Sequence, residues 1–351
     1  MALILGIESS CDESAAAVTE GPHEVLASIV ATQDELHQPY AGVVPEIASR
    51  AHLQRVPMVV DQALQQAGCT LQDLDAIAVG HAPGLIGSLL VGVSAAKTLA
   101  WSIDRPLLGV HHLLAHVHAP ALNDVPIEFP AIGLLASGGH TAILSQTDPL
   151  HANRLGRTID DAVGEAFDKA AITLGLGWPG GPAVEKLAAD GDPSAVKLPI
   201  ASLDGPDLNC SFSGLKTALL YATRGQPEGR GRHATFPRTA EDLTHQARAD
   251  LAASFQHAAI EALIRALDQA CVRVNARSLV GGGGVLANTL LRQRLEELAD
   301  RHDVTLRLPP QRFCIDNAAM IAGLGAHMLA AGRTSGLDLQ ALARMPVEAK
   351  S

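Results

Sequence analysis

The sequence predicts an α/β fold with a duplicated architecture. Apolar segments of strand length alternate with longer segments of helical periodicity along most of the 351 residues, a pattern typical of α/β proteins with mixed sheets. A unit of strand, short polar turn and strand stands near the N-terminus, and a similar unit returns near residue 131. The chain is also too long for one ordinary core, so two domains are expected.

The first half opens with expected strands at residues 2–7 and 15–18, joined by the polar turn Glu8-Ser-Ser-Cys-Asp-Glu-Ser14. Helical patterns follow at residues 56–67 and 88–102, with an apolar strand at residues 76–80 between them. The turn can direct backbone N–H groups and hydroxyls at an anion, as concave backbone nests do.

The second half begins with expected strands at residues 131–136 and 142–145 around the turn Ser137-Gly-Gly-His-Thr141. Helices are expected at residues 161–174, 248–271 and 286–301, and a further strand at residues 278–280. The tail beyond Arg333 is expected to fray. One polar turn is weak evidence for a ligand, but two that face each other across a cleft would form a nucleotide clamp.

The charge balance argues against a chain that holds nucleic acid by itself. It carries 26 basic and 37 acidic residues, a net charge of −11, whereas such proteins are usually basic. One local exception lies in a stretch rich in glycine and proline, residues 225–239, which we expect to be a solvated loop. Its arginines could instead contact RNA; the hypothesis names Arg230, Arg232 and Arg238.

Cysteine usage and hydropathy indicate the compartment. The five cysteines are scattered and form no CxxC pair, which is typical of a reducing cytoplasm. No apolar segment is long and unbroken enough to cross a membrane, and the N-terminus lacks the basic region of a signal peptide. We therefore expect a cytoplasmic protein without membrane contact.

Two histidines form the most informative motif. His112 and His116 lie four residues apart after an apolar segment, so on a helix both imidazoles project from one face and can bind one metal ion. Zinc peptidases of the HExxH type have a glutamate directly after the first histidine, and here that residue is Leu113. Buried or solvated histidines are the alternative interpretation, and His111 and His118 are competing ligands from the same segment.

A run of four glycines, residues 281–284, separates an apolar strand from a helix whose first turn carries Asn288. Glycines let a ligand approach the backbone, and a helix N-terminus favours anions. The spacing matches neither the dinucleotide fingerprint nor the P-loop. We interpret the run as a nucleotide contact, with an unliganded tight turn as the alternative.

Three acidic residues, Asp161, Glu165 and Asp168, are expected on one helical face. An ordinary solvated face and a site for a polar ligand or cation are both compatible with this spacing. Residues 178–182 (Trp-Pro-Gly-Gly-Pro) are expected to form a rigid loop, and Lys216 could meet a phosphate or solvent.

Taken in order, these strings resemble those of the bacterial tRNA N6-adenosine threonylcarbamoyltransferase family. The resemblance covers about residues 3–330 and rests on nine ordered motifs: Gly6-Ile-Glu-Ser-Ser-Cys-Asp-Glu-Ser14, Gly42-Val-Val-Pro-Glu-Ile-Ala-Ser-Arg50, His111-His-Leu-Leu-Ala-His116, Leu135-Ala-Ser-Gly-Gly-His-Thr141, Gly164-Glu-Ala-Phe-Asp-Lys169, Pro179-Gly-Gly-Pro182, Phe212-Ser-Gly-Leu-Lys216, the glycine run with Asn288, and Cys314-Ile-Asp-Asn317.

The resemblance implies two duplicated lobes of the actin, Hsp70 and sugar-kinase type around a nucleotide-binding cleft. It places an N-terminal lobe at residues 1–130, completed by a C-terminal helix at 317–351, and a C-terminal lobe at 131–316. It also implies one iron ion per subunit, or zinc in some preparations, with His112, His116 and Asp316 as ligands. Threonylcarbamoyl-AMP would contact Leu135, Ala136, Ser137, Gly138, Gly139, Asp168, Gly181 and Asn288.

The implied reaction transfers the threonylcarbamoyl group from threonylcarbamoyl-AMP to N6 of the adenosine next to the anticodon (position 37) in ANN-decoding tRNAs, and releases AMP. Asp12, Glu13 and His140 are candidates for the general base. Implied partners are tRNA, an inactive paralogue as heterodimer, a small P-loop ATPase and the synthase of threonylcarbamoyl-AMP. A sugar-kinase-like phosphotransferase, which shares the fold, and a metallopeptidase, which shares the histidine pair, are alternatives.

Overall fold

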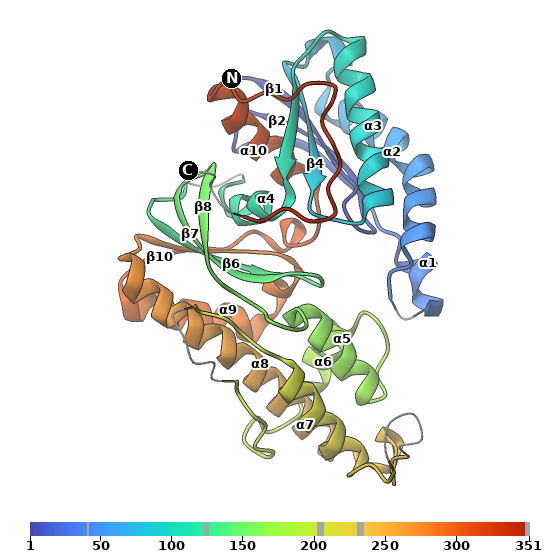
Figure 1. Cartoon of the computed structure of the whole chain (residues 1–351), viewed down its shortest axis with the longest axis vertical. Helices are drawn as coiled ribbons and strands as arrows, with labels where there is room; N and C mark the ends of the chain where they lie inside the picture. Colours follow the sequence, from blue (N-terminus) through green and yellow to red (C-terminus); the bar gives the residue numbers. More distant parts are fainter. Residues whose placement is uncertain (41, 123–125, 202–206, 230–234, 348–351) are drawn as a thin grey trace.

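The structure, a computed structural model that describes residues 1–40, 42–122, 126–201, 207–229 and 235–347, contains two mixed sheets, one above the other in Figure 1. The first sheet has the strand order β3-β2-β1-β4-β5. Its strands β1 to β3 pair antiparallel, whereas β4 and β5 add parallel to β1. Their bounds are β1 (Leu3–Glu8), β2 (Ser14–Glu20), β3 (Glu24–Ala31), β4 (Ala76–Ala82) and β5 (Leu107–His111).

The second sheet repeats this pattern with the order β10-β9-β6-β7-β8. Strands β6 to β8 pair antiparallel, and β9 and β10 add parallel on the other side of β6. Their bounds are β6 (Ala131–Ala136), β7 (Thr141–Asp148), β8 (His151–Arg157), β9 (Ser278–Gly282) and β10 (Thr305–Arg307). The repeated topology confirms the predicted α/β fold with two duplicated halves.

Helices cover both faces of the first sheet. Helices α2 (Pro45–Ala67) and α3 (Ile86–Ser102) lie side by side on one face, and α10 (Ala318–Ala330) packs on the other. The short helices α1 (Asp34–His37) and α4 (His112–His118) complete this half. Helix α2 starts well before the predicted residue 56, because Pro45 suits a first helical position. It ends where Gly68 adopts a left-handed conformation.

The helices of the second half are α5 (Val163–Thr173), α6 (Gly180–Ala188), α7 (Ser213–Arg224), α8 (His245–Val274) and α9 (Thr289–His302). Short 3₁₀ turns include η3 (Ala119–Ala121), η6 (Gly284–Ala287) and η7 (Gln311–Phe313). The prediction of a rigid loop at residues 178–182 is wrong, because Gly180 to Pro182 already form the first turn of α6. None of the described helices could span a membrane.

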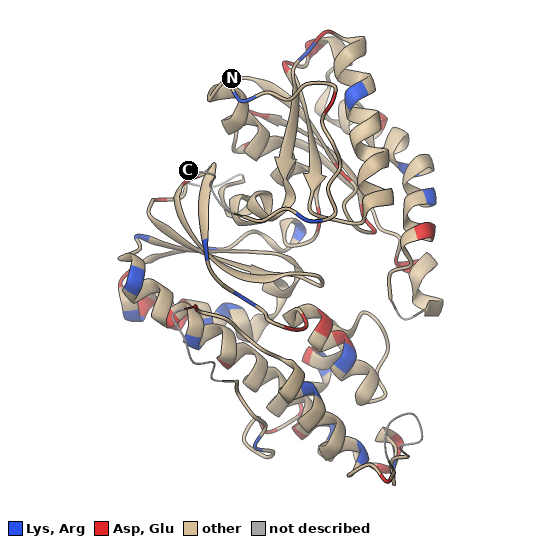
Figure 2. Cartoon of the chain, in the orientation of Figure 1, with Lys and Arg blue, Asp and Glu red and all other residues tan. Residues whose placement is uncertain are grey.

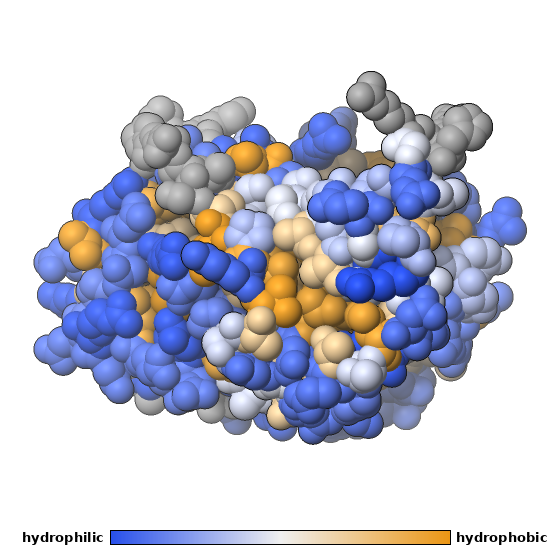
Figure 3. Space-filling view, turned by 90° about the horizontal axis from the view of Figure 1, so that it is seen from below, coloured by the Kyte–Doolittle hydropathy of each residue, from blue (hydrophilic) through white to orange (hydrophobic). Residues whose placement is uncertain are grey.

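The core consists mainly of aliphatic side chains, as the scarcity of aromatic residues requires. One cluster fills the space between the second sheet and its helices, and two others lie on opposite faces of the first sheet. Most charged residues lie on helices and connecting segments (Figure 2). On the face seen from below, hydrophobic residues are exposed near the centre and hydrophilic residues surround them (Figure 3).

The C-terminal region differs from the expectation of a helix over 317–351 and of a frayed tail beyond Arg333. Helix α10 ends at Ala330, and residues 334–347 continue as an extended strap across the molecule (Figure 1). Ser335 bridges to Leu107, the Leu342 N–H donates to the His81 carbonyl over 2.9 Å, and Val347 is buried. These tertiary contacts keep the strap in place without helical structure.

Candidate metal and nucleotide site

His112, His116 and Asp316 come together at the junction of the two halves. Helix α4, which follows the last strand of the first sheet, carries the two histidines, and Asp316 follows the last strand of the second sheet. The two Nε2 atoms are 3.2 Å apart, and Asp316 Oδ1 lies 3.0 Å from His116 Nε2 and 3.6 Å from His112 Nε2. Both histidines are buried.

The donor set fits a transition-metal ion. Two ligand atoms about 2.0–2.1 Å from a tetrahedral ion are roughly 3.3 Å apart, close to the three separations observed. Imidazole nitrogens and a carboxylate oxygen suit iron or zinc. His112 Nδ1 lies 3.0 Å from Glu8 Oε2, an arrangement that directs the other nitrogen of the ring toward the ion. By contrast, His118 Nε2 lies 3.1 Å from the Pro22 carbonyl and does not join the group.

The charged side chains at this junction shift one another's pKa values. Burial lowers the pKa of His112, but the facing carboxylates of Glu8 and Asp316 outweigh it and raise the pKa to about 9. Burial raises the pKa of Asp316, yet the two histidines hold it below its ordinary value. Burial, followed by the proximity of His112 and His116, lowers the pKa of His140 to about 4. An incoming cation would therefore have to displace a proton from His112.

The first polar turn, between β1 and β2, lies beside these side chains. Glu8 is fully buried, and its Oε1 accepts from the backbone N–H of Ser10 over 2.5 Å. Ser10 Oγ lies 3.2 Å from His112 Nδ1. Burial, then the charges of Asp316 and Asp12, raise the pKa of Glu13 well above its ordinary value. Asp12, Glu13 and Asp34 form a second group of converging carboxylates.

The second polar turn, between β6 and β7, is fixed by hydrogen bonds and by the close approach of two glycines. The Ser137 N–H donates to the His140 carbonyl over 2.9 Å, and the Gly164 N–H donates to the Ser137 carbonyl over 3.3 Å. A Cβ on Gly164 would lie 2.6 Å from that carbonyl oxygen, and Gly283, at φ +101, leaves no room for one beside Ala136. On Gly138 and Gly139, in contrast, a Cβ would meet open space.

The remaining predicted substrate residues surround helix α5. Asp168 Oδ1 accepts from the Gly180 N–H over 2.9 Å, so the carboxylate caps the start of α6. Burial nevertheless raises its pKa. A Cβ on Gly181 would meet open space. Asn288 caps α9 by accepting from the Leu291 N–H, and its amide also donates to Gln256.

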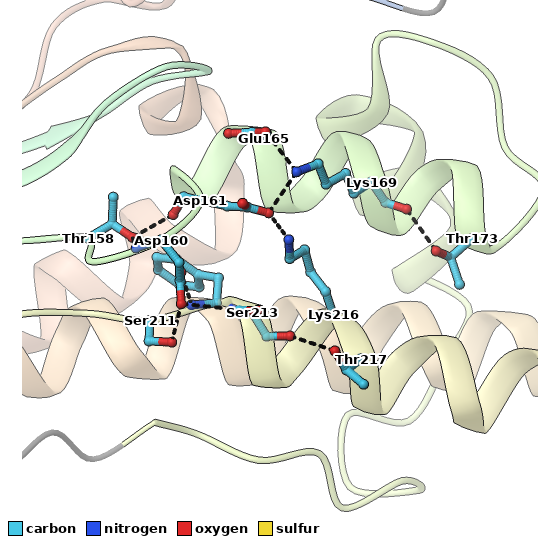
Figure 4. A network of polar contacts seen from close by, with 11 residues as sticks. Thr158, Asp160, Asp161, Glu165, Lys169, Thr173, Ser211, Ser213, Lys216 and Thr217 are labelled. Atoms are coloured by element: carbon cyan, nitrogen blue, oxygen red, sulfur yellow. Dashed lines mark hydrogen bonds and ion pairs between the residues drawn. The ribbon is translucent and has the colours of Figure 1, made fainter. Parts of the chain in front are cut away.

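The prediction that Asp161 shares one helical face with Glu165 and Asp168 is wrong, because α5 begins only at Val163. Asp161 precedes α5 and lies between Lys169 and Lys216, with both of which it pairs (Figure 4). Glu165 also pairs with Lys169, at 2.8 Å. The lysines neutralise the charges of Asp161 and Glu165, and Lys216 binds a carboxylate within the protein rather than solvent alone.

Arg238 of the basic loop also has a structural contact. Its guanidinium donates to the carbonyls of Ala222 and Thr223 and so satisfies the end of α7. Arg230 and Arg232 lie outside the described residues.

Sequence reasoning missed the roles of Glu8 and the strap. Glu8 ends an otherwise apolar strand, and a buried carboxylate at such a strand end is a signal that a partner is present. No sequence feature of the strap predicts its position, because the residues that it contacts are distant in the chain.

Comparisons with known proteins identify the family of the chain. Residues 24–323 match the TsaD family model, described as tRNA N6-adenosine threonylcarbamoyltransferase. The protein of that name from Symbiobacterium thermophilum is 50% identical over 341 residues, which cover 97% of this chain and 95% of that one. Its counterpart from Anaeromyxobacter dehalogenans (strain 2CP-C) is 46% identical and covers 97% and 98% of the two chains.

Solved structures support the fold alone. Full-length HypF, in a phosphate- and nucleotide-bound form, superposes with a TM-score of 0.61 at 13% identity, and the match covers 95% of this chain but 47% of HypF. Component A of (R)-2-hydroxyglutaryl-CoA dehydratase from Acidaminococcus fermentans gives a TM-score of 0.52 at 14% identity and covers 94% and 100% of the two chains.

Proposed function

The chain belongs to the tRNA N6-adenosine threonylcarbamoyltransferase family, and from this premise we propose how its residues carry out that transfer. Membership of the family gives the activity, and tRNA as the substrate. The observation that carries the assignment of roles is the convergence of His112, His116 and Asp316. Ser10 of the first polar turn contacts His112, and His140 of the second turn lies near enough for both histidines to affect its pKa. The proposed lobes are residues 1–130 with α10, and residues 131–316.

In this proposal the second half of the chain binds threonylcarbamoyl-AMP. The contacts would come from the turn at 135–139, from Asp168 and Gly181, and from Asn288. The open space over Gly138, Gly139 and Gly181 supports a ligand there, because the backbone is accessible without a side chain in the way. Asp168 and Asn288 would act partly by fixing the helix starts that line this space.

The His112, His116 and Asp316 side chains would hold the metal, with iron as the expected ion and zinc as the substitute. A bound ion would supply Lewis acidity and orientation for the threonylcarbamoyl end. Glu8 fixes the His112 ring through Nδ1, and burial of both histidines excludes water from the ligand atoms.

The transfer itself joins the adenosine N6 nitrogen to the carbamoyl carbon and breaks the bond to AMP. The amine is a weak nucleophile, so positioning of the two substrates must supply most of the acceleration. Asp12, Glu13 and His140 remain the proposed candidates for the group that accepts the N6 proton. All three come from the two polar turns, and Glu13 and His140 lie close enough to Asp316 for its charge to affect their pKa values.

The central test uses His112→Ala and Asp316→Ala. Both variants should fold, lose bound metal and fail to transfer labelled threonine from threonylcarbamoyl-AMP to unmodified ANN-decoding tRNA in the presence of the partner proteins. His245→Ala, at an exposed histidine on α8, is the matched control and should retain metal and activity. Full transfer by a metal-free His112→Ala variant would refute the role of the site.

A protein partner is also part of the proposal, since the acidic chain is not expected to hold tRNA by itself. An apolar groove of about 700 Å³ runs between α2 and α3, lined by Val56, Val60 and Leu64 among others. Leu53 and Leu90 on its rim are 64% and 51% exposed. This groove suits the inactive paralogue, and a P-loop ATPase and the upstream synthase would complete a cytoplasmic system.

The groove assignment predicts that Leu53→Asp with Leu90→Asp weakens binding of the paralogue while threonylcarbamoyl-AMP binding persists. No observation favours the alternatives of a phosphotransferase or a metallopeptidase. Leu113, at the position where a peptidase of the HExxH type has its base, belongs to an apolar cluster.

A further inference from the structure

A second cavity lies where the C-terminal strap crosses from one half of the molecule to the other. The strap (residues 334–347) is fixed to the first sheet through Ser335, whose Oγ accepts from the Gly109 N–H over 3.0 Å, and through Gln340, whose carbonyl lies 3.0 Å from His81 Nδ1. Its end is fixed to the other half, where Val347 packs in a cluster with residues of β6, β7 and α4.

This cavity has a volume of about 370 Å³, within the range of ligand-binding pockets. Its walls are residues 343–347 of the strap, strands β7 and β8, and the polar turn at Gly139 and His140. Because Leu135 and Gly139 also belong to the proposed substrate turn, the cavity lies directly beside the transfer site.

The charge of the cavity is opposite to that of the whole chain. Its walls include Arg154 and Arg157 of β8 and Arg344 of the strap, and none of its described lining residues is Asp or Glu. Figure 2 shows blue segments along β8 and on the strap where it passes α4. In a chain with a net charge of −11, the exposed guanidinium groups of Arg157 and Arg344 on the same cavity create a local positive potential.

Arg157 and Arg344 are exposed, and no described residue accepts a hydrogen bond from either guanidinium. A guanidinium binds phosphate oxygens through two parallel N–H donors, and polynucleotide binding depends chiefly on such contacts. The described lining residues include no Phe, Tyr or Trp to stack on a base and no Asp, Glu, Asn or Gln to read a base edge, so the chemistry favours the sugar–phosphate backbone.

We propose that this arginine-lined cavity binds backbone phosphates of the tRNA close to the adenosine that is modified. The inference rests on the proposed function, since it assigns to this face the RNA substrate of the same site. The proposal also assigns a role to the strap. The strap positions Arg344 in a cavity whose other arginines belong to the second sheet, so the phosphate site forms only when the strap spans both halves.

The test compares Arg157→Gln/Arg344→Gln with the control Arg105→Gln/Arg277→Gln. The control removes the same charge from two exposed arginines outside the cavity. Binding of a fluorescent, unmodified anticodon stem–loop RNA to the protein in its active assembly is measured by anisotropy between 50 and 200 mM salt. The cavity variant should bind about ten-fold more weakly than the control. Its association constant should also depend less on salt. The slope of log K against the logarithm of the salt concentration should be less negative by about 1.4, or about 0.7 for each lost phosphate contact.

Equal affinities and slopes for the two double variants would overturn the proposal. So would an equal loss of threonylcarbamoyl-AMP affinity or of thermal stability in the cavity variant, because that would indicate a general defect. Transfer of labelled threonine by the unaltered protein tests the proposed function separately. If the unaltered protein transfers nothing while the two double variants still differ in RNA binding, the cavity remains an RNA site and the proposed function is what fails.

Discussion

Replacement of Gly164 by alanine should move the turn between β6 and β7 and so test its proposed role in substrate binding. Gly164 lies in the first turn of α5, directly behind the turn between β6 and β7. An alanine Cβ would lie 2.6 Å from the Ser137 carbonyl oxygen and 2.8 Å from Gly138 Cα, whereas ordinary contacts begin at 3.4 Å. The difference between 3.4 and 2.6 Å means that the turn or the helix must retreat by about 0.8 Å.

Two quantities should change. Overpacking of this kind lowers the free energy of unfolding by about 1–3 kcal/mol. A misplacement of about 1 Å in a catalytic site costs on the order of 100-fold in rate, so transfer at saturating tRNA should fall by about one to two orders of magnitude. Urea unfolding measures the first quantity, and single-turnover transfer of labelled threonine measures the second.

Gly214→Ala is the matched control. Gly214 is exposed in the first turn of α7, and a Cβ there would meet nothing within 4 Å. The control should leave transfer unchanged and stabilise the protein by up to about 1 kcal/mol, since alanine loses less backbone entropy in a helix. If Gly164→Ala behaves like the control in both assays, the turn is not held by this contact and the reasoning is wrong.

Three further predictions concern polar groups. Glu8→Gln should weaken metal binding by about 10–100-fold in a chelator competition, because His112 loses its anionic partner; unchanged affinity would remove Glu8 from the site. Asp161→Asn should lower the free energy of unfolding by about 1 kcal/mol and leave threonylcarbamoyl-AMP affinity unchanged, since its partners are lysines of the same protein. Burial lowers the pKa of His52, so folding favours its neutral form. Stability should be full above the unfolded pKa of about 6.5 and fall as pH drops below it. Urea unfolding at pH 7.5 and 5.5 should show a smaller loss for His52→Gln than for the unaltered protein.

Periodicity and turn chemistry predicted most of the fold, but not an outer strand of the first sheet or the start of one long helix. The central strands and the long helices were predicted because their burial patterns are regular over many residues. Strand β3 was missed, since most of its side chains are only partly buried and it follows β2 after a short turn. The start of α2 was missed because Glu46 and Arg50 weaken the apolar pattern there.

The site could be predicted only in part. Some of its residues are close in sequence on one helix, whereas others come together only through tertiary packing. His112 and His116 share a helical face, so spacing alone brings them together. The pairing of Asp161 with Lys216 could not be inferred, because it joins two segments whose approach is decided by the packing of α5 against α7. The same is true of the strap, whose backbone partners are His81 and Leu107.

The duplication explains why Asp316 joins the histidines although spacing gives no sign of it. In each half the fifth strand runs parallel to the fourth and leads into a segment at the centre of the molecule: β5 into α4, and β10 through η7 into α10. Helices α4 and α10 contact each other, so these equivalent segments meet where the halves join. The first repeat contributes two of the proposed ligands there and the second repeat contributes one. A complete set of the proposed ligands therefore requires both halves in their docked arrangement. Any motion between the halves would change the proposed metal site and the separation of the two polar turns together.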